Sequence, residues 1–180
     1  LSEKMLEQAE KDLQKCGQFS ERFSLYHLPM EKLAELPERH FDVITSSFAF
    51  HYIEHFPALL STIHDKLSSN GILVFSQEHP ITPCHKEGER WEKNDKKQQI
   101  AYRLNHYREE GKRNRNWFKQ PFQTYHRTTA TIINNLIHAG FQIEQMEEPM
   151  LADQPQWHNE FKDLSHRPPL LFIKARKVEK

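Results

Sequence analysis

Polar residues that could do chemistry follow two short apolar runs, where strands are expected to end. Ser46-Ser47 come directly after Phe41–Thr45, and Glu78-His79 come shortly after Ile72–Phe75. Short apolar runs without alternation are typical of parallel strands buried on both faces. In an open α/β sheet, ligands bind outside the carboxyl ends of such strands. The block 41–80 therefore predicts one side of a ligand site, lined by hydroxyl, carboxylate and imidazole groups.

Other chemistries lack a convincing set of residues. His51 and His55 have helical spacing, but no cysteine or carboxylate completes a tetrahedral metal site. His79, Cys84 and His85 lie in a proline-rich loop without a fourth ligand. Neither a G-x-S-x-G nucleophile motif nor a phosphate-binding P-loop occurs in the sequence. We predict no metal centre.

The first part of the chain predicts two helices and a strand. Ser2 is a suitable N-cap for a helix whose apolar stripe runs from Met5 to Cys16. Alternation over Arg22–Leu28 indicates a strand, and Glu31–Leu36 reads as a short helix ended by Pro37.

The elements around block 41–80 and beyond it follow the same rules. One helical face, expected to end near Asn70-Gly71, is formed by Phe56, Leu59, Leu60, Ile63 and Leu67. A second helix begins at Thr128 or Thr129 and ends at Ala139-Gly140, and strands are expected at Phe141–Met146 and Leu170–Ala175. No helix lies between these strands, so they predict an antiparallel hairpin at the sheet edge.

Residues 82–121 interrupt this pattern. They are strongly charged, with scattered aromatic residues such as Trp91, Tyr102 and Trp117. One interpretation is a solvated excursion, and the other is a lid or substrate-facing insertion. Long loops in compact domains are usually functional or disordered, and the aromatic residues favour partial packing.

Length and charge place the chain in a broad class. The 180 residues are expected to form a single domain, and 25 basic residues balance 25 acidic ones. This balance argues against nucleic acid or an anionic membrane surface as a partner. No transmembrane or signal segment is evident. Cys16 and Cys84 are interpreted as free thiols, which predicts a cytoplasmic protein.

Four segments, in order, resemble one enzyme family. They are LSEKMLEQAEK, FDVITSSFAFHYI, NGILVFSQEHPI, and YHRTTATIINNLIHAGFQIEQMEEP followed by RPPLLFIKARK. Together they resemble the class I S-adenosylmethionine-dependent methyltransferases, and specifically the type 11 subgroup that acts on small molecules. The resemblance covers nearly the whole chain.

The resemblance implies a Rossmann-like α/β fold. Its features would be a mostly parallel sheet, helices on both faces and a C-terminal antiparallel hairpin. The family's first βα unit, with its glycine-rich turn and the acidic residue that holds the ribose, is missing from this sequence. The five glycines are too scattered to supply that turn. The sheet edge left exposed would need upstream residues or a partner chain, such as a homo-oligomer, to cover it.

The resemblance also assigns residues to S-adenosylmethionine. Those expected to contact this cofactor are Pro29, Met30, Glu31, Ser46, Ser47 and His51. Pro29, Met30 and Glu31 correspond to the adenine contact, although Pro29 supplies no N–H. Ser46 and Ser47 correspond to the methionine end.

The acceptor side is assigned in the same way. His79 is the first candidate for a general base, and His126 is the second, because the pKa of histidine lies near neutrality. Substrate contacts are expected from Glu78, His79, Tyr125, His126 and Arg127. Glu78 also has an ordinary explanation, an ion pair with Arg127 or another basic residue.

Three functions are consistent with these residues. The first is methyl transfer from S-adenosylmethionine to a small-molecule acceptor. The second is a catalytically silent fragment or degenerate paralogue that keeps the fold. The third is a nicotinamide-dependent α/β enzyme, against which the terminal antiparallel hairpin argues.

Overall fold

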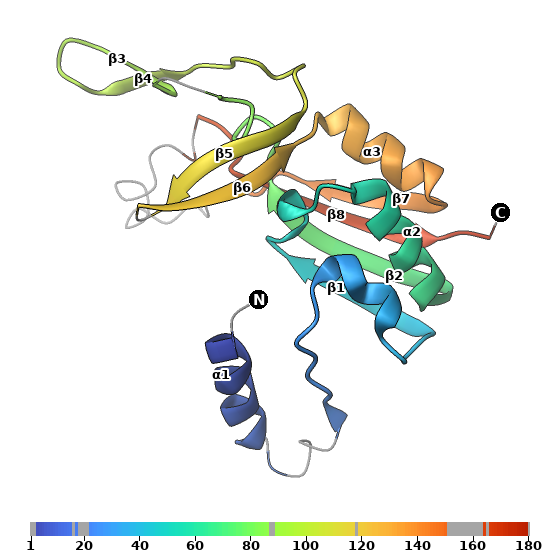
Figure 1. Cartoon of the computed structure of the whole chain (residues 1–180). Coiled ribbons are helices and arrows are strands. Elements are labelled where there is room, and N and C mark those ends of the chain that lie inside the picture. Colours follow the sequence, from blue (N-terminus) through green and yellow to red (C-terminus); the bar gives the residue numbers. More distant parts are fainter. Residues whose placement is uncertain are drawn as a thin grey trace. The chain divides into compact units, whose positions relative to one another are not determined.

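The computed structural model describes residues 3–15, 17, 22–86, 89–117, 119–150, 164 and 166–179. The chain divides into two compact units, residues 1–36 and 37–180 (Figure 1). Each unit is described by itself.

The first unit contains two helices and no described strand. Helix α1 spans Glu3–Gln14 and the 3-10 helix η2 spans Met30–Glu35. No residue of α1 is buried, and Met5 on its apolar stripe is 75% exposed. The strand predicted at 22–28 is wrong, since residues 23–28 have no regular secondary structure and residue 22 is not in a strand. A strand needs a partner for its backbone hydrogen bonds, and the described part of this unit offers none.

The second unit is built on a four-stranded sheet in the order β1-β2-β8-β7. The strands are β1 (Phe41–Ser47), β2 (Leu67–Glu78), β7 (Phe141–Glu147) and β8 (Leu170–Lys177). Strands β1 and β2 are parallel, whereas β8 is antiparallel to both β2 and β7. Three strands therefore run in one direction and one opposes them. The mixed sheet confirms the predicted hairpin and places β7 at one edge.

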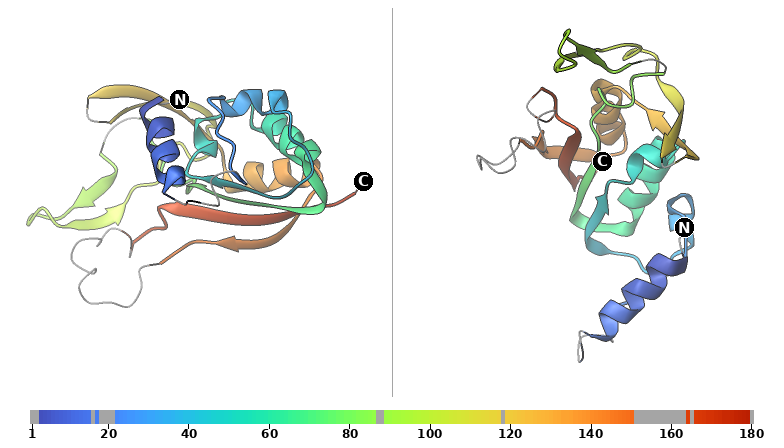
Figure 2. Two further views of the ribbon diagram at one scale, coloured as in Figure 1. Left: turned by 90° about the horizontal axis from the view of Figure 1, so that it is seen from below. Right: turned by 90° about the vertical axis from the view of Figure 1, so that its left-hand side faces the viewer.

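One face of the sheet carries the core. Leu73 and Phe75 of β2 lie opposite Ala175 and Ile173 of β8, and all four are buried. Helices α2 (Phe56–Lys66) and α3 (Thr129–His138) pack against the sheet and against each other. Figure 2 shows both helices on the same side of the sheet. The prediction of helices on both faces is therefore wrong for the described part of this unit.

The other face and one edge of the sheet remain open within the described residues. Val43 on β1 is 53% exposed and Phe172 on β8 is 39% exposed. Strand β1 pairs only with β2 in this sheet. An exposed edge strand was predicted, and its covering by other residues or a partner chain stays a prediction.

The Asn70-Gly71 pair does not cap a helix. Helix α2 ends at Lys66, and β2 begins at the next residue. Asn70 has φ 62°, and a Cβ on Gly71 would lie 3.0 Å from the carbonyl oxygen of Phe41. The pair therefore marks a distortion inside β2, where the ladder with β1 shifts register.

The region after β2 forms two hairpins beyond the end of the sheet to which β1 and β2 point (Figure 1). The first consists of β3 (Trp91–Lys93) and β4 (Gln99–Tyr102), the second of β5 (Gly111–Trp117) and β6 (Gln120–His126). The second hairpin contacts the short 3-10 helix η3 (Phe50–Tyr52), which follows β1. None of the helices described is long and apolar enough to span a membrane.

Candidate functional site

A pocket of about 310 Å³ lies where the sheet's carboxyl ends meet the β5–β6 hairpin. Its lining residues are Phe48, Tyr52, Glu78, Arg115, Asn116 and Phe122. They come from three places: the segment after β1, the last residue of β2, and the hairpin. This is the position at which open α/β sheets bind ligands.

An ion pair between Glu78 and Arg115 joins the sheet to the hairpin. Nη1 of Arg115 donates to both carboxylate oxygens, at 2.6 and 2.5 Å. The side chains are only 10% and 18% exposed. The sequence predicted a basic partner for Glu78 but suggested Arg127 first; the structure places Arg115 there. A largely buried ion pair loses hydration, so its geometry matters more than that of a surface pair.

Aromatic rings form the walls of the pocket. The rings of Tyr52 and Phe122 lie 6.2 Å apart, and the Arg115 guanidinium lies 5.5 Å from the centre of the Phe122 ring. Phe122 stands directly opposite Arg115 in the hairpin ladder. Phe48 has φ 51°, and its N–H donates to the carbonyl oxygen of Ser76 at 2.9 Å. That hydrogen bond holds the unusual turn at the end of β1.

His51 packs behind two residues that line the pocket. It is 3% exposed, and its ring packs against Phe48 and Tyr52 with centroids 4.6 and 4.3 Å away. Nδ1 of His51 accepts a hydrogen bond from the N–H of Glu78 at 3.4 Å. Burial lowers the pKa of His51 to about 4, although the nearby Glu78 carboxylate opposes this shift. At pH 7 His51 is therefore neutral.

Ser46 presents a buried hydroxyl that has no hydrogen-bond partner among the described residues. Such an atom is costly to leave unpaired. It lies at the carboxyl end of β1, one residue before Ser47. The predicted contact of Ser46 and Ser47 with a ligand stays a prediction.

His79 is tied to its surroundings through both ring nitrogens. Nε2 lies 2.7 Å from a carboxylate oxygen of Glu148, and Nδ1 accepts from the N–H of Ile81 at 3.3 Å. Burial, the largest influence, lowers the pKa of His79, and the Glu148 hydrogen bond opposes that shift. His79 does not line the pocket around Glu78. Its role as a base stays a prediction.

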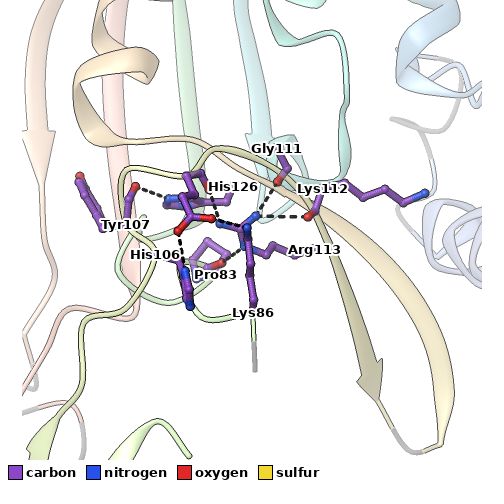
Figure 3. A network of polar contacts seen from close by, with 9 residues as sticks. Pro83, Lys86, His106, Tyr107, Gly111, Lys112, Arg113 and His126 are labelled. Carbon is purple, nitrogen blue, oxygen red and sulfur yellow. Dashed lines mark hydrogen bonds and ion pairs between the residues drawn. The ribbon is translucent and has the colours of Figure 1, made fainter. Parts of the chain in front are cut away.

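His126 belongs to a buried network under the hairpin (Figure 3). It is fully buried, and its Nε2 bonds to the carbonyl oxygen of Tyr107 at 2.7 Å. Nδ1 is also buried and has no partner among the described residues. Burial lowers the pKa of His126. The predicted contact of His126 with substrate stays a prediction.

Arg113 is the centre of the same network, and sequence reasoning missed it. Its Nε donates to the carbonyl oxygen of Pro83 at 2.9 Å. Its Nη atoms donate to the carbonyl oxygens of Gly111, Lys112 and Glu109. This buried guanidinium is therefore held by main-chain carbonyls (Figure 3).

Tyr125 and Arg127 contact the segment between η3 and α2. The Tyr125 hydroxyl donates to Glu54 Oε2 at 3.0 Å. Arg127 donates to the carbonyl oxygens of Ile53 and Glu54, and its guanidinium lies 4.9 Å from the centre of the Phe56 ring. Burial lowers the pKa of Arg127 to about 10, so it remains charged at pH 7. Their substrate contacts stay predictions.

Pro29, Met30 and Glu31 lie in the first unit. Pro29 precedes η2 as its N-cap residue, and Met30 and Glu31 form its first turn. The carbonyl oxygen of Pro29 accepts the N–H of Lys32 at 2.9 Å. Their adenine contact stays a prediction, because the two units are described separately.

Cys84 is a free, buried thiol, as expected, whereas Cys16 and Ser2 lie outside the described residues. Within the described part of the chain, no three His, Cys, Asp or Glu side chains are arranged to hold a metal ion.

Comparison with known proteins places this fold in a family. The model of the "Methyltransferase domain" family matches residues 1–75. An S-adenosylmethionine-dependent methyltransferase from Mesorhizobium loti has a crystal structure that is 33% identical, with a TM-score of 0.72, over 83% of this chain and 68% of that one. The chain belongs to the S-adenosylmethionine-dependent methyltransferases.

Two further relatives extend this finding. The crystal structure of a proposed S-adenosylmethionine-dependent methyltransferase from Listeria monocytogenes is 29% identical, with a TM-score of 0.82, over 99% of this chain and 78% of that one. An uncharacterized protein from Haemophilus influenzae is 94% identical over all 180 residues, which span 71% of its length.

Proposed function

We propose that this protein transfers a methyl group from S-adenosylmethionine to a small-molecule acceptor held between η3 and the β5–β6 hairpin. The observation that carries the proposal is the pocket at the carboxyl ends of β1 and β2, in a chain of this family. The bound cofactor supplies an activated methyl group on its sulfonium. The protein's task is then to position the acceptor and exclude water.

The residues at this end of the sheet have distinct tasks in the proposal. The hydroxyl of Ser46, which has no partner among the described residues, contacts the cofactor together with Ser47 beside it. His51 supports the aromatic wall and fixes the main chain at Glu78. Glu78 fixes Arg115 and with it the hairpin. Because burial lowers the pKa of His51 to about 4, this residue is neutral at pH 7 and its contacts serve to position the acceptor.

His79 remains the proposed general base for acceptors that carry a proton; since it does not line the pocket, the proton would reach it through a bridging water. Its contact with the Glu148 carboxylate is the kind of pairing that orients an imidazole and stabilises its charged form. Replacing His79 with alanine is expected to lower turnover about 100-fold or more and to leave cofactor affinity within about twofold. Unchanged turnover would remove His79 from the mechanism. A Glu148→Gln variant keeps a side chain of the same shape that can hydrogen-bond to His79. It therefore separates the effect of the Glu148 charge on turnover from the effect of the hydrogen bond.

Calorimetry with S-adenosylhomocysteine tests the proposal. We expect binding to the 180-residue chain or to the longer Haemophilus influenzae relative, with Ser46→Ala weakening binding by about tenfold, since a buried hydroxyl loses its partner. Thr62→Ala, at an exposed hydroxyl on α2, is the matched control and should change nothing. Absence of binding to both proteins would favour the catalytically silent alternative.

A further inference from the structure

Arg115 has more hydrogen-bond donors than its protein contacts use. Its Nη1 group is engaged by Glu78, but within the described residues Nε and Nη2 donate to no acceptor. Neither nitrogen is among the buried side-chain atoms that lack a partner, so both can be reached from solvent and by a ligand. Nε and Nη2 form the flat, side-on edge of a guanidinium, which matches the two oxygens of a carboxylate.

The rest of the pocket suits a flat ring. Phe48, Tyr52 and Phe122 supply aromatic surfaces, and the Phe48 and Tyr52 side chains are 40% and 38% exposed. A volume of about 310 Å³ lies at the low end of the range for small-molecule sites, about 300 to 1,000 Å³. It therefore fits a molecule of one or two rings. Tyr52 and Asn116 line the same space, and their side chains make no hydrogen bond within the described residues.

The charges of the pocket exclude other classes. Both oxygens of Glu78 accept from Arg115, whose charge neutralises this carboxylate and makes the pocket a poor site for a cationic ligand. A phosphate would bring up to two negative charges beside Glu78, and like charges repel strongly in a partly buried site. A single planar carboxylate adds one charge and satisfies both unused nitrogens.

We infer that the methyl acceptor is a small aromatic carboxylate, with its ring packed against Phe48, Tyr52 and Phe122 and its carboxylate on Nε and Nη2 of Arg115. This inference rests on the proposed function, because it names the acceptor class of the same pocket. The acceptor's hydroxyl or amine would lie toward the end of β1, where Ser46 and Ser47 stand.

Three probes separate charge from ring shape. Benzoate carries both features, benzamide keeps the ring without the charge, and cyclohexanecarboxylate keeps the charge without the aromatic ring. Each is titrated calorimetrically into the protein, first alone and then with saturating S-adenosylhomocysteine. We expect benzoate to bind at least tenfold more tightly than benzamide and about threefold more tightly than cyclohexanecarboxylate.

Variants at Arg115 test the contact itself. Arg115→Lys keeps a positive charge beside Glu78 but loses the planar fork, and we expect at least tenfold weaker benzoate binding. Arg115→Gln should weaken it further, and its circular dichroism spectrum checks folding. Arg108→Gln, an exposed arginine just before the hairpin, is the matched control and should bind benzoate normally.

The outcomes distinguish the two proposals. The proposal of an aromatic carboxylate acceptor would be overturned by equal affinities for benzoate and benzamide, or by full benzoate affinity in a folded Arg115→Lys protein. Methyl transfer would still stand in either case if S-adenosylhomocysteine binds. Selective benzoate binding without S-adenosylhomocysteine binding to either this chain or the longer Haemophilus influenzae relative would support the pocket's chemistry and overturn the proposed function.

Discussion

The sheet with its two helices and the β5–β6 hairpin are stabilised by different interactions. In the sheet, apolar side chains such as Phe50, Phe75 and Leu60 are almost completely buried between strands and helices. On the buried side of the hairpin, the buried residues are polar or charged: Arg113, Thr124 and His126. The first region is held mainly by loss of apolar surface from water, the second by hydrogen bonds with fixed geometry.

This difference gives the two regions different sensitivities. Apolar packing is spread over many contacts and stabilises the whole unit. The hairpin depends on a few directional contacts, chiefly those of Arg113 with main-chain carbonyls and of Arg115 with Glu78. We therefore expect substitutions in the hairpin to act locally, whereas substitutions in the core should lower global stability.

The largest effect is expected from Phe75→Ala in the core. Phe75 is 1% exposed and packs on Phe50 with ring centroids 4.8 Å apart. Deleting a buried phenyl group typically costs about 3 to 5 kcal/mol, through lost burial and the cavity left behind. Urea unfolding measures this loss. Phe172→Ala, on the open face of the same sheet, is the control and should cost about 1 kcal/mol or less; equal losses would contradict the assignment of the core face.

The next effect concerns pH and His51, at the junction of the two regions. Its pKa is lowered by burial from 6.5 to about 4, so between these values the unfolded chain binds more protons than the folded one. Stability from this residue is complete above pH 6.5 and is lost as pH falls toward 4, by about 3 kcal/mol in total. His79 and His126 act in the same direction.

His51→Asn tests this prediction, because the asparagine side-chain oxygen can still accept the N–H of Glu78. Urea unfolding at pH 7 and pH 4 should show a smaller pH dependence in this variant, by about 3 kcal/mol. A pH dependence as steep as that of the unmodified protein would show that His51 does not titrate with a lowered pKa.

Sequence reasoning succeeded where the apolar pattern decides the structure. Helix α2 buries Phe56, Leu59, Leu60 and Ile63, as its periodicity predicts. Thr128 caps α3 by accepting the N–H of Thr131 at 3.2 Å. Both features depend on residues close together in sequence, so one-dimensional spacing contains the information needed.

The hairpins and half of the pocket could not be predicted in this way. Strand β5 reads GKRNRNW, and its alternation places Arg113 and Arg115, not apolar residues, on the inner side. Charged residues in alternation look like a solvated segment. Their partners, Pro83 and Glu78, lie 30 and 37 residues away, so no local pattern reveals them.

Arg113→Met should loosen the hairpin but spare the sheet. The change keeps an unbranched side chain of similar reach and removes the donors to the carbonyl oxygens of Pro83 and Glu109. Losing hydrogen bonds from a charged donor should cost about 2 kcal/mol, or about thirtyfold in the local opening equilibrium. Hydrogen exchange should show this for amides of β5 and β6 but not for those paired between β2 and β8. Lys112→Met, on the exposed side of β5, is the control.

The smallest effect is expected from Glu109→Gln, which separates two contributions of one residue. The carboxylate pairs with Lys86 Nζ at 2.5 Å and with His106 Nδ1 at 2.6 Å, and these contacts lower the pKa of Glu109 to about 2. All three side chains are exposed, so water and salt screen these pairs. The carbonyl oxygen of Glu109, which accepts from Arg113, is unchanged by the substitution. Hydrogen exchange in β5 and β6 should therefore match that of the unmodified protein. A loss of protection as large as that in Arg113→Met would mean that the surface ion pairs hold the hairpin, and that the buried carbonyl contacts do not.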